Sequence, residues 1–219
     1  MNAFRAVVFD LDGTLIDTLA DLGTSMNQTL KENGFPQWPL DSYRQMVGNG
    51  MRRLTERALG SYATPENVEK ILERFLIVYD QNCTRLSVPY EGIPELVDRL
   101  YQASVALVVV TNKTEQQAQK IIRHFFDPEQ FSAVYGNISG RKTKPDPAAT
   151  WEALEKLHVQ PEEALFVGDS NVDVETAKNA GLPCAGAVWG FRGAEELRQA
   201  GADWLVKQPL DLLKLIVHT

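Results

Sequence analysis

The chain has 219 residues, of which 44% are hydrophobic and 23% charged, and its formal net charge is −7. This length and composition allow a full hydrophobic core, with room for one medium domain and a second inserted one. The acidic balance argues against a nucleic-acid-binding surface, which would need a basic stripe. It leaves open a locally positive site for a small anionic substrate.

The cysteines and histidines give no sign of a metal or disulfide framework. Cys83 and Cys184 lie far apart in the sequence, which favours reduced, buried thiols. No two of the three histidines, His124, His158 and His218, have the spacing of metal ligands. We therefore expect any metal site to be built from carboxylates.

Membrane and export signals are weak. The longest apolar run, from Val105 to Val110, is too short to cross a bilayer. The first predicted strand begins almost at Met1, which leaves no room for a signal peptide. We expect a soluble, cytoplasmic protein without a membrane partner.

The first predicted element is a buried strand over residues 6–9, followed directly by Asp10-Leu11-Asp12-Gly13-Thr14. Gly13 marks a sharp turn at the end of this strand. Carboxylates at the carboxyl end of a strand lie where open α/β sheets bind their ligands. Two like charges so close are costly unless they share a proton or a cation, and Mg²⁺ prefers such oxygen ligands.

The chain then reads as helical through residue 87, with helical signals that begin at Asp17, Tyr43, Met51 and Thr64. No strand signal appears in this block, which is longer than a connection within a sheet needs. We interpret residues 17–87 as an inserted helical cap domain and residues 1–16 and 88–219 as an α/β core domain. The joining segments, 15–16 and 87–89, are the expected hinges.

Strands and helices alternate from Tyr90 onward, which predicts a parallel sheet with right-handed crossovers. Strands are predicted over residues 105–110, 133–135, 164–167, 184–188 and 204–206. Helices are predicted around residues 93–100, 114–125, 147–157 and 210–216, and a further helix follows the strand over 164–167 and ends at about residue 180. No G-x-G-x-x-G follows a strand and no P-loop is present, so neither nucleotide-binding fingerprint applies.

Three further segments carry polar residues at strand ends or helix starts. Thr111-Asn112-Lys113 offers hydroxyl and amide donors for phosphate oxygens, or ordinary helix caps. In the basic segment 141–147, two prolines fix the backbone around Lys144, whereas no proline follows Lys142. The alternative for that segment is a solvated loop.

The third segment, Gly168-Asp169-Ser170-Asn171-Val172-Asp173, follows a predicted strand and opens a helix. Asp169 is poised at the strand tip as a further carboxylate ligand for a cation. Asp173 lies about one helical turn further on and faces roughly the same way. The alternative is an N-cap acid with a first-turn acid that complements the helix dipole.

These four segments, in this order, resemble the signature of the haloacid dehalogenase-like (HAD) superfamily. The resemblance covers essentially the whole chain and implies a Rossmann-like parallel-sheet core with an inserted α-helical cap domain. It implies that Asp10 is a nucleophile that attacks phosphorus and that Asp12 is the general acid/base. Dehalogenases of the superfamily lack the second Asp and P-type ATPases carry a Thr there, so Asp12 indicates phosphate-monoester chemistry.

The resemblance also implies roles for the other motifs. It implies that Thr111 and Asn112 bind the phosphate and that Lys144 neutralises charge on the nucleophile and the phosphoryl group. It assigns Mg²⁺ as the cofactor. The implied metal-binding residues are Asp10, Asp12 and Asp169, with Asp173 in the outer shell.

A weaker resemblance concerns the substrate, a small phosphate ester. Segments 47–54, 56–59, 189–192 and 200–203 are similar to bacterial phosphatases that act on 2-phosphoglycolate. This implies that the amides of Gly48, Asn49 and Gly50 and the guanidinium of Arg52 or Arg53 bind the substrate carboxylate. The alternative is a glycine turn between two helices with surface arginines.

Several alternatives within and outside the family stay open at this point. A sugar-phosphate phosphatase or a β-phosphoglucomutase would share the core and the cap. A phosphonoacetaldehyde hydrolase would need a cap lysine, and neither Lys31 nor Lys70 has a matching context. A receiver domain of signalling proteins would carry its acceptor aspartate in mid-chain. A non-catalytic phosphate-binding protein of this fold would be expected to lack a motif residue, and none is missing.

Overall fold

The computed structural model describes residues 3–217, so His218 lies outside the described residues. A six-stranded parallel sheet forms its centre, in the order β5-β4-β1-β6-β7-β8. The strands are β1 (Ala6–Phe9), β4 (Ala106–Thr114), β5 (Ala133–Asn137), β6 (Ala164–Gly168), β7 (Cys184–Ala187) and β8 (Trp204–Val206). The predicted α/β class is confirmed.

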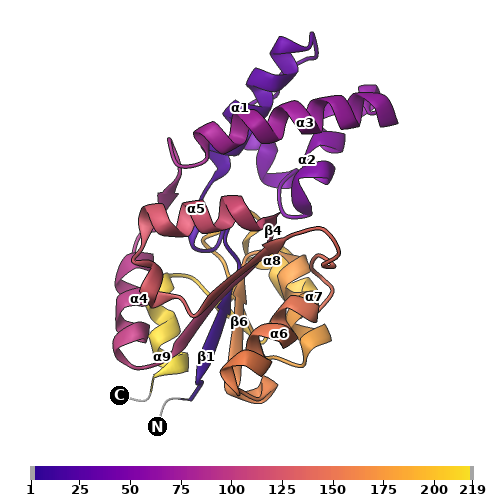
Figure 1. Ribbon diagram of the computed structural model, residues 1–219. Helices are drawn as coiled ribbons and strands as arrows, with labels where there is room; N and C mark the ends of the chain where they lie inside the picture. The colour runs from indigo at the N-terminus through magenta and orange to yellow at the C-terminus, as the bar shows by residue number, and fades with distance from the viewer. Residues whose placement is uncertain (1–2, 218–219) are drawn as a thin grey trace.

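Helices cover both faces of this sheet (Figure 1). One face carries α4 (Ile93–Gln102), α5 (Glu115–Phe125) and α9 (Leu213–Ile216), and the other carries α6 (Ala148–Leu157), α7 (Asn171–Ala180) and α8 (Gly193–Ala200). Along β1, Val7 and Phe9 pack into the first layer, while Ala6 and Val8 pack into the second. Burial on both faces explains the unbroken apolar run of this strand. We refer to the sheet and these helices as the α/β core.

A group of helices lies beyond the carboxyl edge of the sheet (Figure 1). Its main members are α1 (Leu19–Glu32), α2 (Gly50–Leu59) and α3 (Pro65–Asn82), with a 3₁₀ turn over Leu40–Gln45. The predicted apolar stripe of α1 is buried together with that of α3, through residues such as Met26 and Phe75. The Thr64 hydroxyl caps α3 by accepting from the Asn67 amide. We call residues 19–82 the helical segment.

Two short strands join the helical segment to the α/β core. β2 (Ile16–Asp17) pairs antiparallel with β3 (Val88–Pro89), with Ile16 opposite Pro89. The sequence does not predict a strand here, because a strand of two residues has no periodicity to detect. The helical signal predicted at Asp17 is two residues early, because α1 begins at Leu19 with Thr18 as its N-cap residue, although the Asp17 carboxylate accepts from the Leu19 amide.

The structure differs from the predicted elements in the extent of one strand, in an additional helix and in the division of the last helix. β4 continues four residues beyond Val110, through the polar segment 111–114, with a shift of register against β5. Helix α8 was not predicted, because Leu197 is its only buried residue and gives no apolar stripe. The predicted last helix divides into a 3₁₀ turn (Pro209–Leu212) and α9.

Two compositional expectations have structural counterparts. Cys83 and Cys184 are both buried free thiols, as predicted. Among the described helices, none combines the length and the apolar character that a membrane crossing requires.

Candidate active site

The site lies at the carboxyl ends of three neighbouring strands. β1 pairs with β4 on one side and with β6 on the other, in matching register. Asp10 and Asp169 directly follow β1 and β6, and Thr111 lies in the last part of β4, so the three residues meet at one edge of the sheet. The Asp10 amide extends the pairing by donating to the Val167 carbonyl at 2.9 Å.

Three carboxylates converge at this edge. Asp10, Asp169 and Asp173 each place an oxygen within 4.8 Å of the others, and all three residues are buried. Burial raises the pKa of Asp10 to about 7, against the opposing effect of Lys144, and also raises the pKa of Asp169 well above its ordinary value. Carboxylate oxygens are the ligands that a hard divalent cation prefers, and such a cation would offset the repulsion among the three buried carboxylates.

Glycines make the room around Asp169. Gly13 has a φ of +86°, and a Cβ atom there or at Gly190 would clash with the Asp169 side chain. Asp169 is further oriented by the Phe191 amide, which donates to Oδ2 at 2.7 Å, and by the Thr14 hydroxyl, at 3.3 Å from Oδ1. The turn predicted at Gly13 thus also serves close packing against a site carboxylate.

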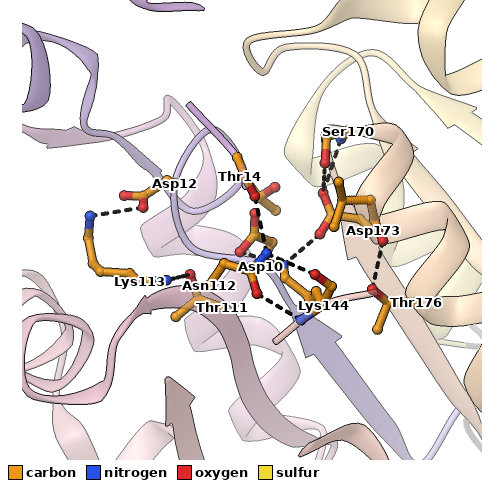
Figure 2. A network of polar contacts seen from close by, with 12 residues as sticks. Asp10, Asp12, Thr14, Thr111, Asn112, Lys113, Lys144, Ser170, Asp173 and Thr176 are labelled. Atoms are coloured by element: carbon orange, nitrogen blue, oxygen red, sulfur yellow. Dashed lines mark hydrogen bonds and ion pairs between the residues drawn. The ribbon is translucent and has the colours of Figure 1, made fainter. Parts of the chain in front are cut away.

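Lys144 bridges two of the carboxylates. Its Nζ lies 2.8 Å from Asp10 Oδ1 and 2.6 Å from Asp173 Oδ1 (Figure 2). Burial opposes the lysine charge, but the ion pairs with Asp10 and Asp173 outweigh it and raise the pKa of Lys144. By contrast, the side chain of Lys142 is 79% exposed and pairs only with Asp146.

Asn112 fixes the backbone of Lys144. Its Oδ1 accepts from the Lys144 amide at 2.8 Å, and its Nδ2 donates to the Lys144 carbonyl at 3.1 Å. Nδ2 also lies 3.3 Å from the Gly48 carbonyl of the helical segment. The Asn112 side chain therefore supports the lysine and contacts the helical segment.

Asp173 has two functions at once. Its Oδ2 accepts from the Ser170 amide and hydroxyl, at 3.0 and 2.7 Å, which forms a capping box at the start of α7. Its Oδ1 faces Lys144. A Cβ atom at Gly168 would collide with this carboxylate, so the glycine before Asp169 is needed for the arrangement. Asp173 thus caps the helix and also contacts the site lysine, so the two interpretations of segment 168–173 are compatible.

The Asp12 carboxylate lies apart from the acidic cluster. Its Oδ1 accepts from the Thr18 hydroxyl at 2.7 Å, and its Oδ2 pairs with Lys113 Nζ at 2.8 Å (Figure 2). Lys113 also donates to the Tyr79 hydroxyl of α3 at 2.9 Å. The structure therefore places Asp12 between the α/β core and the helical segment, and away from the other predicted metal-binding residues.

Lys113 is a site residue that sequence reasoning left without a role. The alternation of side chains along the predicted strand could have indicated its position. Had the strand been extended through residue 114, Lys113 would have fallen on the same side as Thr111.

A small cavity lies beside Asp10 and Asp12. From the α/β core it is lined by Asp10, Asp12, Thr111, Asn112 and Lys113, and from the helical segment by Leu22, Val47, Gly48, Gly50, Met51 and Leu54. The catalytic candidates thus face a small, partly apolar space closed by the helical segment.

The predicted cap residues divide into two groups. Gly48 and Gly50 line the cavity, whereas the Asn49 side chain accepts from Arg57. Arg52 and Arg53 do not line the cavity. Both side chains are exposed and form ion pairs with Glu69 and Glu56, respectively.

Arg192 joins the α/β core to the helical segment, a contact that sequence reasoning did not assign. Its guanidinium donates to Gln45 Oε1 at 2.6 Å and to the Val47 carbonyl at 2.7 Å. It therefore holds the loop that leads to Gly48 against the core.

Comparison with known proteins gives consistent results. A phosphoglycolate phosphatase of Mannheimia succiniciproducens is 34% identical, covering 99% of this chain and all of the relative. An N-acetylmuramic acid 6-phosphate phosphatase of Pseudomonas aeruginosa is 32% identical, covering 97% of this chain and 94% of the relative. A solved structure from Haemophilus somnus, described as a predicted phosphoglycolate phosphatase, superposes with a TM-score of 0.90 at 31% identity and covers 98% of this chain and 99% of that one. The sequence model of the haloacid dehalogenase-like hydrolases matches residues 7–187, and the chain belongs to that family.

Proposed function

We propose that the chain is a Mg²⁺-dependent phosphomonoester hydrolase that forms an aspartyl-phosphate on Asp10 and takes 2-phosphoglycolate as one of its best substrates. The observation that carries the proposal is the convergence of Asp10, Asp169 and Lys144 beside a small cavity. The full-length relatives named phosphoglycolate phosphatase support the choice of substrate.

The proposed metal site uses Asp10 and Asp169, with Asp173 beside them. Bound Mg²⁺ would supply positive charge that offsets the repulsion between a phosphate dianion and a carboxylate nucleophile. Lys144 adds a second positive charge at Asp10 Oδ1. Because the Asp12 carboxylate is engaged by Thr18 and Lys113, we assign no metal contact to its side chain.

The proposed reaction has two displacements at phosphorus. Asp10 attacks the phosphoryl group, the bond to the leaving oxygen breaks, and Asp12 gives its proton to that oxygen. Asp12 then takes a proton from water, which attacks the phosphorus of the aspartyl-phosphate and releases inorganic phosphate. The Thr111 side chain, which lines the cavity, would orient a phosphate oxygen through its hydroxyl.

The size of the cavity supports a small leaving group. The space beside Asp10 is small and is bounded on one side by the apolar side chains of Leu22, Met51 and Leu54, which suits a two-carbon acid better than a sugar. For this reason we favour 2-phosphoglycolate over hexose phosphates and over the larger ester named for the Pseudomonas aeruginosa relative.

The proposal is tested by a phosphatase screen over small phosphate esters, with Mg²⁺ and with excess EDTA. We expect metal-dependent release of phosphate, with 2-phosphoglycolate among the esters of highest kcat/KM. Full activity in EDTA would contradict the metal-assisted mechanism. A clear preference for hexose phosphates would contradict the substrate alone.

A further inference from the structure

We infer that Lys113 binds the carboxylate of the substrate and is the residue that makes the enzyme prefer phosphorylated small acids. The inference rests on the proposed function, because it names the group that reads the carboxylate of 2-phosphoglycolate. It gives this task to a residue of the α/β core in place of the cap arginines.

Lys113 is held rigidly at the cavity. Its side chain is 0% exposed, and its Nζ contacts Asp12 Oδ2 at 2.8 Å and the Tyr79 hydroxyl at 2.9 Å. Nζ also lies 4.5 Å from the centre of the Tyr79 ring. Since these partners fix the ammonium group before substrate arrives, little ordering is needed on binding.

The ammonium group has capacity for one more acceptor. A lysine Nζ carries three donor hydrogens, and the contacts with Asp12 and Tyr79 use two of them. Lys113 belongs to the lining of the cavity, and we assign the third hydrogen to a ligand bound there.

The rest of the cavity offers no other cation to an acid. Among the residues that line it within 3–217, Lys113 is the only basic one, and the helical segment contributes mainly apolar side chains and two glycines. A carboxylate enclosed there without a partner would be strongly disfavoured. Arg52 and Arg53 are paired with glutamates on the exposed surface of the helical segment.

The geometry of the reaction brings the substrate carboxylate to the side of the cavity where Lys113 lies. With the phosphoryl group at Asp10, the leaving oxygen must face Asp12, which protonates it. In 2-phosphoglycolate a single methylene separates that oxygen from the carboxylate. The carboxylate is therefore confined to the neighbourhood of Asp12, where Lys113 lies.

The test compares two substrates that differ only in this group. In 2-hydroxyethyl phosphate, a neutral CH₂OH replaces the carboxylate of 2-phosphoglycolate. For the wild type we expect kcat/KM to favour 2-phosphoglycolate by about 10²-fold or more, since a charge-assisted contact is lost with the neutral ester. In Lys113→Met we expect this ratio to fall to about one. Any damage that the variant does to Asp12 lowers both rates and cancels in the ratio.

Arg52→Met serves as the matched control, because it also removes one basic side chain near the cavity loop. We expect it to keep the wild-type ratio. If Lys113→Met does not fold, Lys113→Gln decides instead. It removes the charge but retains two N–H donors for Asp12 and Tyr79, and its ratio should also fall to about one.

The outcomes separate the two claims. A wild-type preference that persists in the folded Lys113 variants overturns the role of Lys113 and leaves the proposed substrate standing. Loss of the preference in Arg52→Met but not in the Lys113 variants assigns the carboxylate to the cap arginine. A wild type that treats both esters alike overturns 2-phosphoglycolate as the preferred substrate.

Discussion

The amide and the hydroxyl of Ser87 both donate to Asp21 Oδ2, at 2.8 and 2.7 Å, although the two residues are 66 positions apart. Asp21 also accepts from the amides of Arg85 and Leu86, and its side chain is buried. Since Asp21 lies in the first turn of α1 and Ser87 precedes β3, this carboxylate ties the residues that follow the helical segment to the start of that segment. The contact adjoins the β2–β3 pair through which the helical segment joins the α/β core.

Removal of this carboxylate should destabilise the protein. Asp21→Ala leaves several backbone amides without their acceptor, one of them in a buried residue, and we expect it to lower the free energy of unfolding by about 3 kcal/mol. Urea denaturation measures the change. Asp41→Ala is the control, because Asp41 is 88% exposed and pairs only with Arg44, and it should change stability by less than about 0.5 kcal/mol. Equal small effects in both variants would contradict the role of Asp21.

The two lysines of the basic segment should differ sharply in their effect on activity. Lys144→Ala removes a buried positive charge that contacts Asp10 and Asp173, so kcat should fall by about 10²–10³-fold. Lys142→Ala removes an exposed side chain and should have little effect. Steady-state kinetics on p-nitrophenyl phosphate compares them. The reverse order would overturn the assignment of the lysine.

The arrangement of the site was largely predictable because parallel strands end at one edge. Motifs that follow β1 and β6 had to meet once the strands were placed, which brought Asp10 and Asp169 together. The two prolines beside Lys144 singled out that residue within its basic segment.

The direction in which individual side chains point was harder to predict from the sequence. Asp12 could be placed at the strand end, but its contact with Lys113 depends on how far β4 continues. The cap arginines illustrate the same difficulty. In α2 the buried residues are Leu54, Thr55, Ala58 and Leu59. Helical spacing puts Arg53 opposite this face, whereas Arg52 lies at its border, three residues before Thr55. The position of Arg53 could be inferred from the sequence and that of Arg52 could not, and the glycine turn beside them favoured a binding role.

Stabilisation by Mg²⁺ should increase with pH. In the metal-free protein the pKa of Asp10 is raised to about 7 and that of Asp169 is raised as well, so the folded state holds protons that the unfolded chain releases near 3.8. Asp10 therefore costs the metal-free fold stability as pH rises from about 3.8 to about 7, and Asp169 adds a cost in the same direction. A cation replaces the protons and removes that cost.

Thermal unfolding with and without Mg²⁺, at about pH 6 and about pH 8, measures this linkage. The rise in Tm caused by Mg²⁺ should be larger at the higher pH. Asp169→Asn should greatly reduce it at both values, because a site carboxylate is lost. A metal effect that is larger at the lower pH would contradict the proposed ligands.

The central claim is that Asp10 carries the phosphoryl group during turnover. The most direct measurement is acid quenching of an Asp12→Asn variant during reaction with p-nitrophenyl phosphate and Mg²⁺, followed by mass spectrometry of its peptides. The good leaving group needs no acid, whereas hydrolysis of the intermediate lacks its base, so phosphorylated enzyme should accumulate. We predict a phosphoryl group on Asp10 and none when Asp10→Asn is added. A phosphoryl group on another residue, or turnover at the wild-type rate by Asp10→Asn, would contradict the account.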